Sequence, residues 1–539
     1  MRVVLLTLLT LLLAICVSGG FLSNLGDKVK KTFGGKGGIG EKLKNITMTK
    51  IEKVKKIFGS ATVMKIKEKL SKLKDKAKKL LELPPRMFAA LKERLAKLRR
   101  IKHVQVHEEG DTIEQVNHKS EVDGYLYQSD IVLTEKQADE KEAEINEQVS
   151  GKSRPRRQAF RDRRYPATLW ENGVNYYFDF NANEKLRSVF KKGANQWHQN
   201  TCINIKEDSE AKDKIRIFHE NGCWSHVGRI GGKQDLSLGK GCHAVSTATH
   251  ELGHALGFYH TMARHDRDDY VTINVQNIRV DLYDQFTKQT TATNENYNIT
   301  YDYGSIMNYD GRAFVLPACA DETLGSPFLA FYDILMMNTH YKCLDKCKKD
   351  PKAAKCKMGG YPNPRDCTKC ICPSGYGGPL CDQRPSGCGQ KQEQEDFEIC
   401  NYWIESPAGT QIEVRIDKIS GEFAVPGCRY FGVELNTQKD QLATGYRFCA
   451  KEDEDLSLLA HSNRVPIIIY SRVAQTDIII QYRYVTDGKP GPKVTTPRPT
   501  LPPGQKCEDS PACTENICKS KVLDKANKMG MCPKLCGFC

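Results

Sequence analysis

The sequence predicts a multidomain protein in which an α+β domain is followed by disulfide-rich modules and a β-sandwich. A chain of 539 residues is too long for a single hydrophobic core. Its 22 cysteines are typical of small modules that are held together by disulfides. A third observation is the stretch His250–His260, which carries three histidines at spacings that core packing alone does not require.

The stretch His250–His260 is predicted to bind zinc. His250 and His254 are four residues apart, so a helix presents both imidazoles on one face. Gly257 lets the chain turn back, because glycine adopts positive φ at little cost, and His260 then returns to the same ion. Three neutral nitrogens with an open coordination position are typical of a catalytic zinc site. We therefore expect one zinc ion per subunit.

Glu251 follows the first of these histidines and is not expected to bind the ion. It stands where a general base for an attacking water is needed. The alternative is a buried helix that happens to carry histidines. It is a more plausible explanation of a HExxH pattern alone than of the whole eleven-residue stretch His250–His260. His226, His243 and His265 have no ligand spacing and are taken as ordinary polar residues.

The N-terminus reads as a secretory signal peptide, residues 1–18. After Arg2, the stretch Val3–Val17 is almost wholly apolar, which is too short for a stable membrane span. We therefore expect a secreted, extracellular protein. The net charge of +15 is concentrated before residue 158, in a region that we expect to be removed, so nucleic-acid binding is not expected.

Residues 19–157 are predicted to be a propeptide. Apolar residues keep a three-and-four spacing on both sides of Pro84–Pro85, which predicts two basic amphipathic helices. A helical pro-segment with a solvated charged face is favoured over a membrane-binding one. The cluster Arg154–Arg157 is of the type cut by proprotein convertases, and cleavage after Arg157 leaves Gln158 as the new N-terminus.

Residues 158–344 are predicted to form the α+β domain. Alternating patterns predict strands at Val174–Phe180, Lys214–Phe218 and Ser225–Arg229. Leu186, Val189, Phe190 and Trp197 mark a helix.

This domain resembles the astacin family of metzincin proteases over about residues 160–343. The zinc motif is followed by Met307 and Tyr309, which resemble the metzincin Met-turn. Leu169–Trp170 resembles the opening of a mature astacin domain, Gly222–Ser225 its edge-strand region, and Arg264–Tyr270 the tail of its zinc motif. The resemblance implies a metzincin-type fold and a zinc endopeptidase.

The resemblance also implies a role for each matching residue. The implied zinc ligands are His250, His254, His260 and, as a fifth ligand that swings away and then stabilises the oxyanion, Tyr309. Glu251 is the implied catalytic acid and base, and Met307 the hydrophobic floor under the metal. The substrate backbone is expected to extend the edge strand near Ser225–Arg229.

Two further positions bear on activation. Tyr127–Asp130 resembles the F-x-G-D motif of astacin propeptides, whose aspartate replaces the catalytic water on zinc, so Asp130 is the implied ligand of the latent form. The alternative is that Asp130 is one acid of a solvated acidic segment. Astacins usually carry a glutamate after the third histidine, which pairs with the buried new N-terminus, but this chain has Thr261.

The remaining cysteines resemble three module types: EGF-like (345–382), CUB (388–485) and ShKT (507–539), with a Pro/Thr-rich linker at 486–506. The astacin resemblance implies the pairs Cys202–Cys343 and Cys223–Cys242. The module resemblances imply Cys347–Cys367, Cys356–Cys370, Cys372–Cys381, Cys388–Cys400, Cys428–Cys449, Cys507–Cys539, Cys513–Cys532 and Cys518–Cys536. Cys319 is left without an assigned partner.

The function expected from the sequence is a secreted zinc metalloendopeptidase, made as a zymogen, that hydrolyses extracellular proteins. The module order resembles nematode astacins that act on cuticle and extracellular matrix. Asn45 and Asn298 stand in N-glycosylation sequons. The alternatives are a matrix-binding protein with a degenerate protease and a ShKT-type channel blocker; the latter is weak, because Lys528 is followed by Met529 rather than tyrosine.

Overall fold

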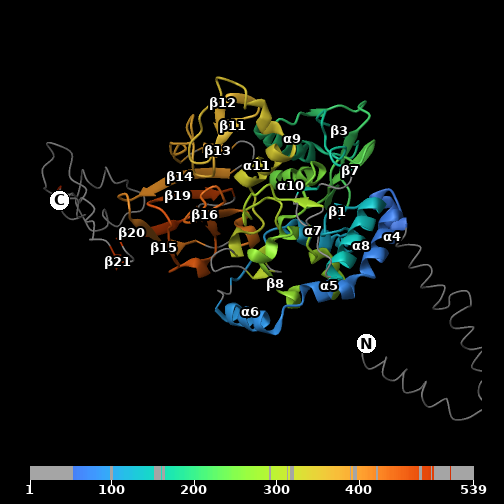
Figure 1. Ribbon diagram of the computed structural model, residues 1–539, viewed down its shortest axis with the longest axis horizontal. Helices are drawn as coiled ribbons and strands as arrows, with labels where there is room; N and C mark the ends of the chain where they lie inside the picture. Colours follow the sequence, from blue (N-terminus) through green and yellow to red (C-terminus); the bar gives the residue numbers. More distant parts are fainter. Residues whose placement is uncertain are drawn as a thin grey trace, which may run out of the picture.

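The structure is a computed structural model. It describes residues 52–97, 101–150, 159–160, 164–290, 293–311, 314–315, 321–388, 390–392, 397–420, 423–472, 476–486, 489–490 and 510. The N-terminal helices lie beside a mixed α+β domain, and a small disulfide-rich region and a β-rich region follow along the chain (Figure 1).

The α+β domain is organised on a six-stranded sheet of order β1-β6-β7-β5-β3-β4. Its strands are β1 (Ile131–Val132), β3 (Val174–Phe178), β4 (Ile205–Glu207), β5 (Lys214–Phe218), β6 (Cys223–His226) and β7 (Lys233–Leu238). Strands β4, β3, β5 and β7 pair in parallel, and β6 is antiparallel to β7. Strand β1, from the N-terminal region, pairs in parallel with β6 and so covers the edge of the sheet.

Two strands are shorter than the alternation predicted. Strand β3 ends before Phe180, which is 97% exposed, because the chain turns there with the Ala182 amide donating to the Asp179 carbonyl. Strand β6 ends before Gly228, whose φ is +70° and whose amide donates to the His254 carbonyl at 2.9 Å. This second turn ties the edge strand to the histidine-bearing helix.

Helices α9 (Glu184–Asn200) and α10 (Val245–Ala255) pack closely against each other. The Asn183 side chain caps α9. The helices approach at Gly193, where a Cβ would stand 2.9 Å from the Thr249 amide nitrogen. The Trp197 indole donates to the Thr249 carbonyl at 2.9 Å. Leu186, Phe190 and Trp197 are fully buried, as the predicted helix requires.

Over residues 62–97, where the apolar spacing predicted two helices, the structure has three: α4 (Thr62–Ser71), α5 (Lys74–Leu81) and α6 (Pro85–Lys97). A turn at Leu73 separates α4 from α5 and keeps Leu70, Leu73 and Ala77 buried. Both helices pack against α8 (Glu135–Val149), which begins with a Thr134–Gln137 capping box. The apolar face is therefore used within the protein.

The rest of the N-terminal region lies along the α+β domain. Its elements are α7 (Ile113–Lys119), η2 (Asp123–Tyr125), β1 and α8. The Asn117 side chain accepts from the Cys223 amide at 2.7 Å and donates to its carbonyl at 2.6 Å. This side chain therefore pairs with the edge strand in the way that another strand would.

After the histidine helix, the α+β domain consists mainly of short elements. They are η3 (Thr261–Ala263), η4 (Arg267–Asp269), β8 (Thr272–Ile273), η5 (Val275–Asn277), η6 (Val280–Phe286), β9 (Asn294–Glu295), β10 (Phe314–Val315), η8 (Asp321–Thr323), α11 (Phe331–His340) and η9 (Cys343–Lys346). Strand β2 (Ala159–Phe160) pairs with β9. The disulfide Cys202–Cys343 joins this part to the residues that follow α9, whereas Cys223–Cys242 joins β6 to the loop before α10.

The disulfide-rich region contains one hairpin, β11 (Tyr361–Asn363) with β12 (Asp366–Ile371). Its disulfides are Cys347–Cys367, Cys356–Cys370 and Cys372–Cys381. These are the pairs that the sequence resemblance implied. The Arg365 guanidinium donates to the Ile203 carbonyl and to Asn204 Oδ1, so this region is fastened to the α+β domain.

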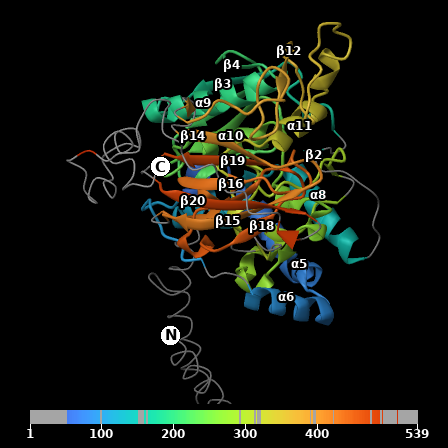
Figure 2. The same ribbon diagram turned by 90° about the vertical axis from the view of Figure 1, so that its left-hand side faces the viewer.

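The β-rich region has two sheets, of order β13-β14-β19-β16-β17 and β18-β15-β20-β21. Their strands are β13 (Gln390–Gln392), β14 (Phe397–Glu405), β15 (Gln411–Ile419), β16 (Phe431–Leu435), β17 (Tyr446–Phe448), β18 (Ser457–Leu459), β19 (Arg464–Ser471), β20 (Ile478–Thr486) and β21 (Lys489–Pro490). The two sheets lie as adjacent layers over a shared core (Figure 2). Disulfides Cys388–Cys400 and Cys428–Cys449 lie in this region, and β21 extends it into the predicted linker.

Buried polar contacts join the β-rich region to the α+β domain. The Thr444 amide and hydroxyl both donate to the Asp302 carboxylate. Arg447 forms a buried ion pair with Glu434 and donates to Ser326 Oγ. The two regions therefore share a specific interface.

Some of the sequence-based expectations concern residues outside the described ranges. These are the signal peptide (1–18), Asn45, Arg157, Gln158, Cys319 and the cysteines at 507–539. Within the described ranges, no helix is long and apolar enough to cross a bilayer.

Candidate metal centre

Helix α10 positions the first two histidines. The whole helix is buried, and His250 and His254 lie one turn apart with their rings 4.7 Å from each other. The chain leaves the helix at Gly257, whose φ of +115° is unfavourable for residues with a Cβ. This turn brings His260 back, with its ring 4.7 Å from that of His254.

The three imidazoles converge on the carboxylate of Asp130 from the N-terminal region. His250 Nε2 and His260 Nε2 lie 3.2 Å and 3.1 Å from Asp130 Oδ2, and His254 Nε2 lies 3.5 Å from Asp130 Oδ1. One atom from each of the four residues falls within 4.8 Å of the others. Four of the five predicted ligands, His250, His254, His260 and Asp130, are therefore brought together.

The other ring nitrogens are held by acceptors. His250 Nδ1 lies 2.6 Å from the Ile306 carbonyl oxygen and His254 Nδ1 lies 2.7 Å from the Phe258 carbonyl oxygen. A backbone carbonyl only accepts, so each Nδ1 carries the proton and each Nε2 presents its lone pair to the centre. This tautomer is the one that binds a metal through Nε2.

Gln128 supplies the acceptor for the third histidine. Its Oε1 lies 3.0 Å from His260 Nδ1, and its backbone amide donates to Gln285 Oε1. Gln128 is fully buried beside Asp130 in the same loop. No sequence pattern points to this glutamine, because 132 residues separate it from His260 and no spacing rule connects them.

The donor set fits zinc. His254 Nε2 and Asp130 Oδ1 are buried and lie 3.5 Å apart, and neither atom forms a hydrogen bond with any described residue. Three imidazole nitrogens and one carboxylate oxygen are the ligand types of four-coordinate zinc. Among the described residues, the metal would be held by His250, His254, His260 and Asp130.

Burial and charge set the protonation states at the centre. Burial lowers the pKa of His260 to about 3, which leaves the imidazole neutral. Burial alone would raise the pKa of Asp130, but the neighbouring His260 and His254 hold it well below the usual value. A neutral imidazole and an ionised carboxylate are the forms that bind a metal.

Glu251 lies on α10 between the two histidines and is fully buried. Neither of its carboxylate oxygens forms a hydrogen bond with a described residue. Burial raises its pKa well above the usual value, and the carboxylates of Asp130 and Glu114 raise it further. A carboxylate that disfavours its charged form in this way is suited to accept a proton.

Met307 and Tyr309 lie under and beside the histidines. The Met307 side chain faces Gly253 of α10, and Met307 is 1% exposed. The Tyr309 ring lies 4.3 Å from the His260 ring, and Tyr309 is also buried. Burial raises the pKa of Tyr309 well above its usual value, so the phenol keeps its proton.

Three other positions named in the sequence analysis make contacts outside this cluster or face solvent. Thr261 donates from Oγ1 to Ser305 Oγ at 2.8 Å, and Ser305 donates to Asp333 Oδ1 at 2.6 Å. His226 lies 2.9 Å from the Val132 carbonyl oxygen through its Nδ1. Asn298 is exposed in a turn with φ +58°.

The fold and the site together define a zinc-dependent hydrolase, with a histidine-rich helix beneath the edge strand of a mixed sheet. A profile of the peptidase family Astacin matches residues 162–342. The zinc metalloproteinase nas-31 of Caenorhabditis elegans is 43% identical over 454 residues, which cover 78% of this chain and 74% of that protein. The zinc metalloproteinase nas-32 of the same organism is 33% identical, over 79% of this chain and 67% of that protein.

The chain belongs to the astacin family, and it is a zinc metalloendopeptidase. Among solved structures, it is similar to high choriolytic enzyme 1, a hatching enzyme zinc-protease of the medaka fish Oryzias latipes. That similarity has 29% identity and a TM-score of 0.30, and it covers 35% of this chain and 94% of the other.

Proposed function

We propose that this endopeptidase is made as a secreted zymogen and that, once residues 19–157 are removed, it hydrolyses extracellular proteins of a matrix or cuticle. The observation that carries the proposal is the position of Asp130 among the Nε2 atoms of His250, His254 and His260. Strand β1, which follows Asp130, pairs with the edge strand β6 and so takes the position that the substrate backbone would occupy. The uncleaved chain thus blocks its own site.

In the latent form, His250, His254, His260 and Asp130 would hold the ion. Bound zinc supplies a Lewis acid that activates a water and polarises the scissile carbonyl. With Asp130 gone, Glu251 takes a proton from the attacking water and returns it to the leaving nitrogen. The lack of a competing hydrogen bond from a described residue at either Glu251 oxygen supports this role.

Tyr309 is proposed to stabilise the developing oxyanion. Its phenol keeps its proton and its ring lies beside the His260 ring, which supports a role for its hydroxyl as a donor near the metal. Met307 is proposed as the apolar floor, because it fills the space against α10 that a glycine leaves. The substrate backbone would pair with β6 once β1 leaves.

The domain boundaries are part of the proposal: signal peptide 1–18, propeptide 19–157, peptidase domain 158–344, EGF-like module 345–382, CUB domain 388–485, linker 486–506 and ShKT module 507–539. Three disulfides support the EGF-like assignment, and two layered sheets with two disulfides support the CUB assignment. A proprotein convertase would cut after Arg157 to leave Gln158. N-glycans are proposed at Asn45 and Asn298, of which Asn298 is exposed.

The test is hydrolysis of a quenched fluorescent peptide by the mature enzyme. Wild type should be active and a zinc chelator should abolish activity. Glu251→Ala should keep its zinc, measured by elemental analysis, and lose about 10²–10⁴-fold in turnover, the range of general acid–base catalysis. A zinc-loaded Glu251→Ala enzyme with wild-type turnover would contradict the assignment.

Secretion and processing need their own measurement. The full chain, expressed in secretory cells, should appear in the medium with Gln158 as its N-terminus. Arg157→Ala should be secreted uncut. Retention inside the cell, or an active form that still carries residues 101–150, would contradict the zymogen proposal.

A further inference from the structure

The β-rich region contacts the peptidase domain at the turn that leads to Met307. The loop between β16 and β17 presents Thr444, which is buried at this interface. Its amide donates to Asp302 Oδ1 at 3.2 Å, and its hydroxyl donates to Asp302 Oδ2 at 3.1 Å. Asp302 is 2% exposed, so its carboxylate depends on donors from the protein rather than on bulk water.

Asp302 holds the turn that precedes the metal floor. Its Oδ1 accepts from the Gly304 amide at 3.0 Å, and its carbonyl accepts from the Ser305 amide at 3.2 Å. The turn leads directly to Ile306, whose carbonyl oxygen lies 2.6 Å from His250 Nδ1. A continuous path of contacts therefore runs from the β-rich region to a histidine of the metal centre.

The two regions approach most closely at Gly304. A Cβ there would stand 2.3 Å from Thr444 Cγ2, 2.5 Å from its Cβ and 2.6 Å from its Oγ1, and these are the three nearest atoms. The Gly304 backbone is not left-handed, so Thr444, rather than the backbone conformation, opposes a larger residue. Position 304 is therefore a sensitive probe of the contact between the two regions.

The loop that carries Thr444 is held by buried side chains at the end of β16. Asn436 Nδ2 donates to the Ala443 carbonyl at 3.1 Å, and the Gly445 amide donates to Glu434 Oε1 at 3.0 Å. The residues on both sides of Thr444 are thus fixed within the β-rich region. Its hydroxyl is therefore presented to the peptidase domain from a rigid support.

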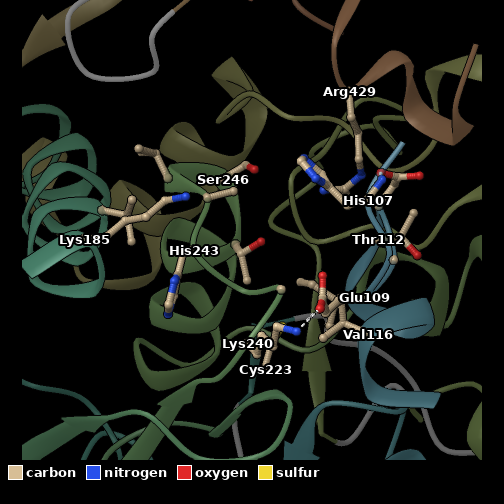
Figure 3. Close-up of a pocket in the computed structure, with 18 of the residues that line it drawn as sticks. His107, Glu109, Thr112, Val116, Lys185, Cys223, Lys240, His243, Ser246 and Arg429 are labelled. Carbon is tan, nitrogen blue, oxygen red and sulfur yellow. Dashed lines mark hydrogen bonds and ion pairs between the residues drawn. The ribbon is translucent and has the colours of Figure 1, made fainter. Parts of the chain in front are cut away.

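A second contact of the β-rich region involves the pro-region instead. Arg429 and Tyr430 line a cavity of about 800 Å³, which His107 lines from the pro-region (Figure 3). The Tyr430 hydroxyl donates to Asp111 Oδ1 at 2.6 Å, and its ring lies 5.7 Å from that of His107. The proposed activation removes both pro-region residues, whereas the contact at Asp302 joins parts that remain in the mature enzyme.

We propose that Thr444 is a positioning residue for catalysis: the β-rich region holds the turn at Asp302, and with it the carbonyl that orients His250. The inference rests on the proposed role of His250 as a zinc ligand. Loss of a group that holds a metal-binding imidazole typically lowers metal affinity or activity by about 10–100-fold. Thr444 acts through the turn rather than on the imidazole, so the loss of its hydroxyl alone should have a smaller effect.

The test is peptide hydrolysis by the mature enzyme, with kcat expressed per bound zinc. Thr444→Val removes the hydroxyl and keeps the shape, so kcat should fall about three-fold at an unchanged KM, somewhat less than the full effect of one hydrogen bond. Zinc should also pass to a chelator faster. Thr444→Ser keeps the hydroxyl and should restore both values. A residue that only stabilised the fold would change the amount of active enzyme, not kcat per zinc.

Gly304→Ala tests the same contact from the other side. The added methyl displaces the turn from Thr444, so kcat per zinc should fall about ten-fold. Thr444→Gly removes all three atoms that the methyl would meet. Added to Gly304→Ala, it should therefore raise kcat to the value of Thr444→Gly alone. Such a recovery would not come from stability, because a further glycine lowers stability.

The matched control is Thr410→Val. The Thr410 hydroxyl donates to the Pro407 carbonyl at 2.7 Å and lies 2.7 Å from Ser406 Oγ, both within the β-rich region, so kcat should keep its wild-type value. Wild-type kcat per zinc in Thr444→Val would overturn the proposal. So would a loss in Gly304→Ala that Thr444→Gly does not relieve; if Gly304→Ala does not fold, Thr444→Val decides alone.

A failure of the proposed function gives a different pattern. In that case hydrolysis by wild-type enzyme would survive a zinc chelator, or no hydrolysis would be seen. The rate at which zinc passes to a chelator does not depend on turnover, so it then reports whether Thr444 supports the metal centre. Faster release from Thr444→Val than from Thr410→Val would support the proposal, and equal release would contradict it.

Discussion

A Cβ atom on Gly253 would lie 2.6 Å from the sulfur of Met307. Such a distance is shorter than any ordinary contact, so α10 and the Met307 segment approach closely because residue 253 is a glycine. Gly253 directly precedes His254, and Met307 directly follows Ile306, whose carbonyl holds His250 Nδ1. The close approach of Gly253 to Met307 therefore holds α10 and the segment after Ile306 in position around the metal site.

Gly253→Ala should therefore disturb the site. The added methyl must displace Met307 or α10, which we expect to cost about 1–3 kcal/mol of stability, as overpacking of a core does. We also expect weaker zinc binding and a lower kcat. Thermal unfolding and zinc titration measure these effects in the mature enzyme.

The control for this change is Gly387→Ala. A Cβ there has no atom within 4 Å and the backbone is not left-handed, so stability should be unchanged. If Gly253→Ala unfolded at the wild-type temperature with wild-type zinc affinity, the packing argument would be wrong.

The metal centre was largely predictable because its residues are close in sequence. The spacing of His250, His254 and His260 follows from helix geometry and one glycine, and the structure has this helix and turn. The disulfides within 388–449 and 347–381 are the pairs that the module resemblances implied. Local periodicity carries such information because it reports on neighbours along the chain.

Contacts between distant segments were not predictable in this way. The pairing of β1 with β6 and the approach of Gln128 to His260 depend on how the whole N-terminal region lies across the domain. The break at Leu73 was missed because the apolar spacing continues through it, although α4 and α5 both pack against α8 and η6 on either side of the turn. Tertiary contacts decided these features.

A second prediction concerns the pH dependence of stability at Asp302. Burial, with a contribution from Asp333, raises its pKa to about 7 from a usual value of 3.8. A carboxyl whose pKa is raised in the folded state stabilises the fold fully below the pKa that it has in the unfolded state. This stabilisation is lost as the pH rises through the pKa of the folded state. Stability should therefore fall between about pH 4 and pH 7, by a few kcal/mol at about 1.4 kcal/mol per unit.

Asp302→Asn removes the charge and keeps the shape that Thr444 contacts. We expect a flatter dependence of the unfolding midpoint on pH in this variant, measured by denaturant titration at each pH. Asp455→Asn, an exposed carboxylate, is the control and should keep the wild-type slope. Identical slopes for Asp302→Asn and wild type would contradict the raised pKa.

Tyr309→Phe should lower kcat while it leaves zinc bound. The phenyl ring can keep its place beside the His260 ring, so zinc should stay bound through the three histidines. Loss of one oxyanion donor typically lowers kcat by about 10²–10³-fold, with a modest change in KM. Elemental analysis together with steady-state kinetics measures both. An empty metal site would instead make Tyr309 an essential ligand.

The new N-terminus should tolerate extension. Thr261 hydrogen-bonds within a network that runs through Ser305 to Asp333, so it needs no partner from residue 158. Ala159 lies in β2, paired with Glu295 of β9. Mature enzyme with a few extra residues before Gln158 should keep activity close to that of the unextended form, measured by peptide hydrolysis on correctly folded protein.

The matched variant for this prediction is Thr261→Val, which removes one buried hydroxyl. It should cost about 1 kcal/mol of stability, the usual value of one hydrogen bond, and should do so equally in extended and unextended enzyme. A large loss of activity on extension alone would show that the N-terminus has a buried role here as well.

The last prediction concerns the loop that closes the metal site. Ser129 has φ +62° and Gln128 has φ +48°, so the loop before Asp130 is left-handed at two consecutive residues that both carry a Cβ. Left-handed backbone costs roughly 1–2 kcal/mol at a residue with a Cβ and little at glycine. Contacts of Asp130 with the histidines must offset this cost.

One substitution should therefore weaken the inhibition of the uncut chain by its pro-region, and another should strengthen it. In an uncut chain that carries Arg157→Ala, the further change Asp130→Ala should release measurable peptide hydrolysis, because nothing then fills the fourth position at the metal. Ser129→Gly should relieve the backbone and hold the pro-region more tightly, by about 1 kcal/mol or several-fold in affinity. The measurement is hydrolysis of the quenched fluorescent peptide by each uncut form, and limited proteolysis reports whether the pro-region stays bound. If the Asp130→Ala form is as silent as its parent while the pro-region stays bound, inhibition is steric and the carboxylate is not the switch.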